Sequence, residues 1–286
     1  MPMPDSMPTP SANTRSGLFL PPILPLLKDQ PMQWLALGFK DLARAPLLST
    51  MHGLILTFLG SCIAWIAHDR FWLLVGSLSG FMVVAPVLAT SLYAMSRALE
   101  KGETVDFRLL LNTWTQWQLR LRHEPDSYWS LIRFGLLLGL AATGWVITSS
   151  ALITLLAPAP IHTPMDFMRH VVLAKEGHLF ELWVGLGGMM AVPVFASSVI
   201  SMPLLLDRRV TVLQAVLTSW KAVLTHPFQM TFWAFLILGF SLLGIFSLLL
   251  GLILVVPMLG HGSWHAYRHM VDVSDLPERL SGQGEP

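Results

Sequence analysis

The sequence has few charged residues and a single cysteine. Asp, Glu, Lys and Arg make up 12% of the 286 residues, whereas hydrophobic residues make up 53%. An ordinary soluble domain carries roughly 25% charged residues, so this composition points to lipid surroundings. With Cys62 as the only cysteine, an internal disulfide, a CxxC redox pair and a cysteine-based zinc site are excluded. The net charge of +1 gives no indication of a nucleic-acid partner.

The sequence also lacks the short motifs of common enzyme sites. It contains no GxSxG, HExxH or GxxxxGK[ST] segment and no DxD-type carboxylate pair. Its serines at 61, 149, 150, 197 and 198 lie in hydrophobic runs, where serine commonly packs helices together. We therefore expect no enzymatic activity and no catalytic residue.

Long uncharged hydrophobic runs predict an all-α membrane protein with six transmembrane helices. Each crossing takes about 20 residues. The predicted spans are residues 47–67, 71–95, 131–157, 179–206, 228–247 and 250–267. The last two share the run from Phe228 to Tyr267, which contains no Lys, Arg, Asp or Glu. We expect a very tight turn between them, near Leu248 to Gly251.

Two tails flank this predicted membrane domain of residues 31–270. Residues 1–30 are rich in proline and lack the unbroken apolar segment of a signal peptide. Residues 271–286 are polar. We expect a disordered tail at the N-terminus and a second loose tail at the C-terminus.

The distribution of Lys and Arg predicts the orientation of the spans. Of the 18 Lys and Arg residues, only Arg70, Arg169 and Lys175 lie on the side opposite the termini. Positively charged loops stay in the cytoplasm. Both termini are therefore expected to be cytoplasmic.

A Gly-x5-Pro spacing recurs in the second, fourth and sixth predicted spans. A proline within a span frees a carbonyl and kinks the helix, and a nearby glycine lets a neighbouring backbone approach. The spacing predicts a common architecture for these spans. The residues are Gly80 and Pro86, Gly187 and Pro193, and Gly251 and Pro257.

An amphipathic segment precedes each odd-numbered span. Residues 34–46 and 215–227 align on their final proline, and residues 107–125 form a looser, longer version. In the first segment, Trp34, Gly38 and Leu42 lie on the apolar side, whereas Lys40 and Asp41 lie on the polar side. Such helices lie in the membrane interface. We therefore expect a pseudo-threefold series of three hairpins, each preceded by an interfacial helix.

The predicted outer loop between the third and fourth spans carries a helix-start pattern. Thr163 can cap a short helix, with Pro164 at its first position and Asp166 three residues after the cap. We expect this helix to rest on the outer membrane surface.

Histidines near the predicted cytoplasmic end are candidate ligands. His52, His261 and His265 fall inside spans, and His269 is expected in water. Neutral imidazoles bind metals and heme iron, and an ionisable group within a span is a functional candidate. The competing interpretation is hydrogen bonding between helices beside an interfacial anchor. That anchor would consist of Trp264, His265, Tyr267 and Arg268. We expect the anchor and no cofactor, with heme or metal binding as the alternative.

The segment PLLLDRR, residues 203–209, has two interpretations. It forms either a recognition site on the cytoplasmic face or the boundary with water. We expect the boundary, with Asp207 and Arg208 in water and Asp207 capping the following interfacial helix.

Several of these segments resemble one family. They are GFMVVAPVLATSLYAMSR (residues 80–97), PLLLDRR and GHGSWHAYR (residues 260–268). They look like the bacterial inner-membrane family known as domain of unknown function 2189. The resemblance implies a polytopic protein of the bacterial cytoplasmic membrane with no established activity. Some relatives are loosely labelled cytochrome c oxidase components, and this label transfers no catalytic residue.

Three functions remain open. The preferred hypothesis is a non-enzymatic scaffold, assembly or regulatory partner of a membrane complex or of lipids. The second is a transporter of a neutral or lipid-like molecule, and the third is a histidine-ligated metal or heme protein linked to respiration. A polar cavity between the second, fourth and sixth spans would favour transport, and a packed glycine interface would favour the scaffold. The oligomeric state is left open.

Overall fold

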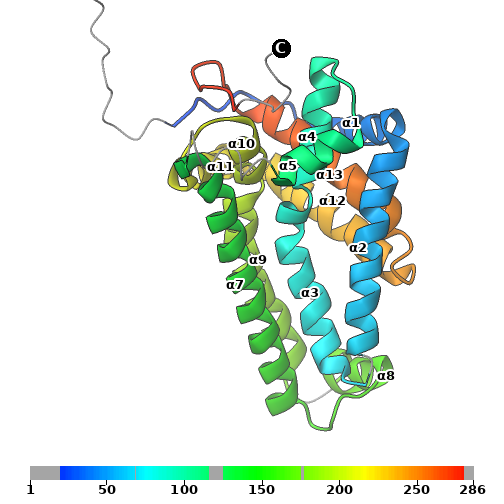
Figure 1. Ribbon diagram of the computed structural model, residues 1–286. Helices are drawn as coiled ribbons and strands as arrows, with labels where there is room; N and C mark the ends of the chain where they lie inside the picture. Colours follow the sequence, from blue (N-terminus) through cyan, green and yellow to red (C-terminus); the bar gives the residue numbers. More distant parts are fainter. Residues whose placement is uncertain (1–19, 68, 116–124, 175–176, 280–286) are drawn as a thin grey trace, which may run out of the picture.

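The computed structural model describes residues 20–67, 69–115, 125–174 and 177–279 (Figure 1). Over these residues the regular elements are helices, joined by loops and turns, with two isolated β-bridges. The elements are α1 (Gln30–Arg44), α2 (Pro46–Ile66), α3 (Phe71–Leu88), α4 (Thr90–Lys101), α5 (Phe107–Thr115), α7 (Pro125–Leu156), α8 (Pro164–Phe167), η1 (Met168–Val172), α9 (Leu179–Ser198), α10 (Ser201–Asp207), α11 (Val212–Thr225), α12 (Pro227–Phe246) and α13 (Leu252–Met270).

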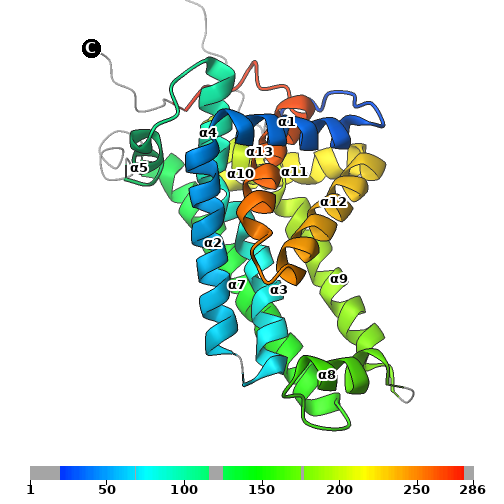
Figure 2. The same ribbon diagram turned by 90° about the vertical axis from the view of Figure 1, so that its right-hand side faces the viewer.

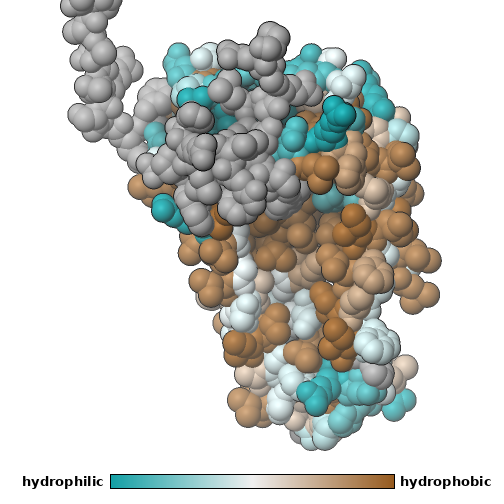
Figure 3. Space-filling model, viewed as in Figure 1, coloured by the Kyte–Doolittle hydropathy of each residue, from teal (hydrophilic) through white to brown (hydrophobic). Residues whose placement is uncertain are grey.

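Among the described residues, five helical segments are long and apolar enough to cross a membrane. They are Pro46–Ile66, Trp72–Lys101, Ser130–Leu156, Leu179–Asp207 and Pro227–Phe246, and they match the first five predicted spans. Figure 3 shows hydrophobic side chains over most of the surface between two more hydrophilic ends. Large apolar side chains such as Leu155, 78% exposed, need apolar surroundings. The chain is therefore a multi-pass membrane protein.

The sixth predicted span is not among these five segments. Its residues 252–267 lie in α13, and its first two residues lie in the turn at residues 247–251 that joins α12 to α13, where the tight turn was expected. Thr57, about midway along α2, donates a hydrogen bond to the Leu249 carbonyl (3.3 Å). The α12–α13 hairpin thus ends beside the middle of α2, as Figure 2 shows. Six complete spans are not confirmed, because a charge-free run suits a membrane-buried hairpin as well as two crossings.

Backbone groups in and next to the turn of the hairpin form hydrogen bonds with the Ser247 side chain. Leu248 and Leu249 adopt positive φ angles of 57° and 69°, which non-glycine residues rarely do. The Ser247 hydroxyl accepts a hydrogen bond from Gly251 N (2.8 Å) and donates one to the Gly244 carbonyl (2.9 Å). Irregular backbone at membrane depth needs such partners, because lipid offers none.

Both described terminal segments lie at one end of the molecule, called here the terminal end, and α8 lies at the other (Figures 1 and 2). Leu24 N donates to the Met270 carbonyl (2.8 Å), and Asp272 N donates to the Pro22 carbonyl (3.1 Å). The described parts of the two predicted tails therefore contact the helices and each other. Residues 1–19 and 280–286 lie outside the described residues.

The final prolines of the first and last amphipathic segments, Pro46 and Pro227, stand at joints between two helices. Ala45 and His226, which precede these prolines, have nearly the same backbone angles, φ −127° and ψ 58° against φ −126° and ψ 58°. Proline disfavours a helical conformation in the residue before it, so α1 and α11 end there and α2 and α12 begin. The third predicted element contributes α5, and its continuation at residues 116–124 lies outside the described residues.

The three Gly-x5-Pro elements do not play equivalent parts. A Cβ on Gly80 or on Gly187 would meet α7 side chains, those of Val146 and Trp145 respectively, whereas Gly251 ends the hairpin turn. Helix α3 ends two residues after Pro86, but α13 runs on without a break through Pro257. Pro193 of α9 is exposed on the surface. Gly80 and Gly187 thus share a packing role against α7, and the predicted common architecture does not extend to Gly251 and Pro257.

The predicted cap at Thr163 is confirmed. Its hydroxyl accepts a hydrogen bond from Asp166 N (3.1 Å), and the Asp166 carboxylate accepts one from Thr163 N (2.9 Å). These reciprocal bonds begin α8 with Pro164 at its first position, and the π-helical turn η1 follows.

Candidate functional site

A cavity of about 370 Å³ lies between α3, α7, α9, α12 and α13. Its lining contains no Asp, Glu, Lys, Arg or His and is mostly hydrocarbon. Volumes of this size are typical of small-ligand sites, which are mainly apolar with a few polar groups. Representative lining residues are Pro86, Trp145, Gly187, Val194, Ile237 and Leu259.

The indole of Trp145 closes the end of the cavity that is nearer to α8. A Cβ on Gly187 would meet this indole, so a larger residue at that position would have to displace it. Trp145 Nε1 donates to Ser79 Oγ (2.7 Å), and Ser79 Oγ donates to the Val75 carbonyl (2.6 Å). The polar atoms at this end are therefore already hydrogen-bonded.

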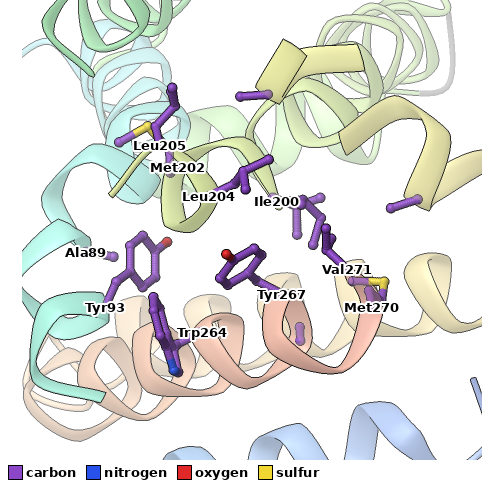
Figure 4. Close-up of a cluster of buried hydrophobic side chains, with 14 of the residues drawn as sticks. Ala89, Tyr93, Ile200, Met202, Leu204, Leu205, Trp264, Tyr267, Met270 and Val271 are labelled. Carbon is purple, nitrogen blue, oxygen red and sulfur yellow. The ribbon is translucent and has the colours of Figure 1, made fainter. Parts of the chain in front are cut away.

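A buried ionic cluster covers the other end of the cavity. Tyr93 and Ser263 line the cavity, and Arg97 and Tyr267 stand one helical turn farther toward the terminal end. Arg97 Nε lies 2.9 Å from Asp207 Oδ1, and the Tyr267 hydroxyl donates to Asp207 Oδ2 (2.7 Å). In Figure 4, Tyr93 and Tyr267 extend from α4 and α13 toward α10.

The C-terminal segment is fixed to this cluster. Arg279 N donates to the Asp207 carbonyl (2.9 Å), and Arg97 donates to the Arg279 carbonyl (2.7 Å). Glu278 pairs with Lys101 at 2.9 Å and with Arg208 at 3.3 Å. The hydrogen bond from Lys101 lowers the pKa of the Glu278 carboxyl. These contacts place residues 276–279 over the buried Asp207.

The predicted role of Asp207 as a helix cap is wrong. Thr211 caps α11 instead, through reciprocal hydrogen bonds with Gln214 (3.2 Å and 3.0 Å). Asp207 ends α10 and is 3% exposed, and Arg208 pairs with it at 3.0 Å. The position is a buried ionic contact rather than a boundary with water, because Arg97 of α4 and Tyr267 of α13 converge on it.

A second polar cluster joins four helices on another side of α13. His261 hydrogen-bonds with Ser49 of α2 through Nε2 (3.0 Å) and with Ser96 of α4 through Nδ1 (2.7 Å). The Ser96 hydroxyl donates to Asp41 of α1 (2.8 Å), and His265 Nε2 lies 2.8 Å from the same carboxylate. Asp41, predicted on the polar side of its helix, is in fact buried, because that side packs against α13.

The number of protons that each side chain can donate fixes the direction of the hydrogen bonds in this cluster. Ser96 has one hydroxyl proton and gives it to Asp41, so its oxygen accepts from His261 Nδ1–H. In neutral His261 the other nitrogen is then an acceptor, and Ser49 donates to it. All donors in the chain from Ser49 to Asp41 therefore point toward the carboxylate.

The environment of Asp41 favours its charged form. Burial alone would raise the pKa of the Asp41 carboxyl, but the hydrogen bonds from His265 and Ser96 outweigh it and hold the pKa below its ordinary value. His269, expected in water, accepts a hydrogen bond from Trp34 Nε1 at Nδ1 (3.2 Å). Burial, reinforced by His265, lowers the pKa of His269.

The candidate ligand set of His52, His261 and His265 is engaged with protein groups. His52 Nε2 hydrogen-bonds to the Leu88 carbonyl (2.7 Å) at the break between α3 and α4. This is a structural role, because the break between α9 and α10 has a similar bond, from Ile200 N to Ser219 of α11 (3.2 Å). In the part of the chain that the structure describes, no group of three or more His, Cys, Asp or Glu could hold a metal ion.

The predicted interfacial anchor is wrong for two of its aromatic residues. Trp264 and Tyr267 are fully buried within the protein, and Trp264 Nε1 donates to Glu100 (3.0 Å). Glu100 also pairs with Arg268 at 2.9 Å. Glu100 and Tyr93 were not singled out from the sequence. Both lie on the same face of one helix as Arg97, and this spacing could have indicated them.

No curated protein and no solved structure matches the chain. A family model does match residues 73–207, which run from α3 to the end of α10 and carry Tyr93, Trp145, Gly187 and Asp207. Over this region, the chain is similar to the family described as predicted integral membrane protein (DUF2189), to which the motif at residues 80–97 also pointed.

Proposed function

We propose that this protein binds a neutral, lipid-like molecule in the cavity between α3, α7, α9, α12 and α13. It acts by binding rather than catalysis, in a bacterial cytoplasmic membrane with the terminal end on the cytoplasmic side. The observation that carries the proposal is a cavity of about 370 Å³ with no ionisable acid or base in its lining except the Tyr93 phenol.

The chemistry of the lining supports an uncharged ligand. A charge placed there would lose its water and find no partner, at a cost of many kcal/mol. The cavity lies between the second, fourth and sixth predicted spans, where the transport hypothesis requires one, but it is apolar. It also differs from the packed glycine interface that the scaffold hypothesis requires.

The membrane-facing surface supports lateral access for the ligand. Ala85, Ala191 and Leu238 line the cavity and are also exposed on the outside of the helices. A lipid-like molecule can therefore pass between bilayer and cavity without crossing water. The Arg97–Asp207 pair covers the terminal end, which favours holding a ligand over passing it through.

Photocrosslinking tests this function. The full-length protein in nanodiscs of phosphatidylethanolamine and phosphatidylglycerol is irradiated with a diazirine-bearing long-chain alcohol. We expect crosslinks concentrated on cavity-lining peptides of α9 and α12.

Two tryptophan variants of α9 provide the matched comparison. Val194→Trp fills the cavity and should abolish these crosslinks. Val192→Trp, at a position 65% exposed to lipid, should leave them intact. Crosslinks spread evenly over the lipid-facing surface, and equal in both variants, would refute the proposal and return the scaffold hypothesis to first place.

A further inference from the structure

We infer that the Tyr93 hydroxyl recognises the ligand by donating a hydrogen bond to an oxygen atom on it. The ligand class is then a neutral amphipathic molecule, such as a long-chain alcohol, ester or ketone, rather than a plain hydrocarbon or a fatty-acid anion. This inference rests on the proposed function and names the chemistry of its ligand.

Tyr93 lines the cavity, and the protein leaves the hydroxyl of this residue without a hydrogen-bond partner among the described residues. The residue as a whole is 3% exposed. A donor that faces an apolar cavity without a partner costs about 1–3 kcal/mol, and such a group calls for an explanation. A ligand oxygen supplies the missing acceptor.

The other polar groups near this end of the cavity already have partners. Ser263 donates to the Leu259 carbonyl (2.9 Å), and Ser198 donates to the Phe195 carbonyl (3.5 Å). Tyr267 donates to Asp207. Unlike these three side chains, Tyr93 has a hydroxyl proton that is free to bond to a ligand. Tyr93 therefore sets the position of a ligand oxygen.

Ser241 of α12 offers a second hydroxyl to the same cavity. Serines within these helices, such as Ser61 and Ser79, donate to the carbonyl four residues earlier. Ser241 lines the cavity and makes no such bond within the described chain. Two available hydroxyls, one on α4 and one on α12, suit a ligand oxygen that can both accept and donate, as an alcohol does.

The charges around the cavity disfavour an anionic head group. The nearest cation along α4 is Arg97, one turn beyond Tyr93, and Asp207 already pairs with it at 2.9 Å. A carboxylate bound beside Tyr93 would therefore lack a free cation and would face the buried Asp207. An alcohol or ester avoids this repulsion.

Competition between matched ligands tests the inference. Unlabelled hexadecanol, hexadecane or hexadecanoate competes with the diazirine alcohol for crosslinking to the cavity peptides of the full-length protein. In the wild type we expect hexadecanol to compete about fivefold better than hexadecane, as one net hydrogen bond predicts. Hexadecanoate should compete worst at neutral pH.

In the variant Tyr93→Phe, hexadecanol and hexadecane should compete equally. In Ser241→Ala, the preference for hexadecanol should fall by a smaller factor. Because Tyr93→Phe removes an unpaired hydroxyl, its Tm without ligand should equal or exceed that of the wild type. Tyr267→Phe loses a bond to Asp207, so its Tm should fall while its ligand preference stays. Equal competition in the wild type, or an unchanged preference in Tyr93→Phe, would overturn the inference alone. Absence of any cavity crosslink would overturn the proposed function with it.

Discussion

His265 Nε2 lies 2.8 Å from Asp41 Oδ2, so α13, near the C-terminus, is tied to α1, the first described helix. The Asp41 carboxylate also accepts a hydrogen bond from the Ser96 hydroxyl, and through Ser96 it is linked to His261. Three helices thus share one buried carboxylate. Removing its charge should loosen the contacts of α1, α4 and α13 together.

The variant Asp41→Asn should show what this carboxylate contributes to stability. Its pKa is held below the ordinary 3.8, so the contribution is present above that value and is lost as the pH falls through the lowered pKa. At pH 7 we expect Asp41→Asn to be less stable by about 1.5–3 kcal/mol, the range for hydrogen bonds to a charged group. Thermal unfolding in detergent from pH 7 to pH 3 measures this, and the difference from wild type should shrink at the acidic end. Asp275→Asn, at an exposed carboxylate, serves as the control.

The Asp207 cluster should be far more sensitive to mutation than its outer partner. Asp207→Asn leaves the buried Arg97 without its counter-ion, a change that typically costs about 3–5 kcal/mol. Glu278→Gln removes a carboxylate whose side chain is 49% exposed, and such pairs contribute about 1 kcal/mol or less. Unfolding curves of both variants in one detergent compare the two losses. Similar small losses would show that the Asp207 pair is not energetically important.

Close helix packing predicts a contrast between two glycines. A Cβ on Gly53 of α2 would collide with the Ile253 carbonyl oxygen of α13, whereas a Cβ on Gly139 of α7 has nothing within 4 Å. Overpacking costs about 1–3 kcal/mol, so Gly53→Ala should destabilise the protein by this amount. Gly139→Ala should be neutral or slightly stabilising, because alanine favours the helix. Thermal unfolding of the two variants side by side tests the packing of α13 against α2.

The depth of the α12–α13 hairpin can be measured by labelling. With Cys62 replaced by Ser, a cysteine at Leu248 should not react with a membrane-impermeant maleimide in intact cells or in inverted vesicles. The reason is that the neighbouring Leu249 contacts the middle of α2. Arg169→Cys should react only in intact cells, and Lys28→Cys only in inverted vesicles. Labelling of Leu248→Cys in intact cells would instead establish two complete crossings.

Local signals in the sequence predict much of the helical framework. Pro46 and Pro227 mark the joints between helices, and the Thr163 capping box begins α8, because each of these effects acts within a few residues. The first five hydrophobic segments are also where hydropathy places them. These features depend on chain-local chemistry alone.

The candidate site depends on which helices meet, and sequence pattern does not determine that. The sequence pattern places Asp41 on the water-facing side of its helix, whereas in the structure Asp41 contacts Ser96 and His265. The unpaired Tyr93 is found only once five helices enclose a cavity. The depth of the hairpin is likewise set by the bond between Thr57 and Leu249, because a hydrophobic run gives no measure of how far it extends.

The short α12–α13 hairpin has a consequence for how the protein is made. Its turn carries only Ser247, three leucines and Gly251 and ends beside the middle of α2, so no polar loop has to be translocated when the last third of the chain is inserted. The turn finds an external partner for its Leu249 carbonyl in Thr57, a residue synthesised almost two hundred positions earlier. We therefore expect insertion in two stages, with α2 through α9 entering the bilayer first and the hairpin docking afterwards into a site already present.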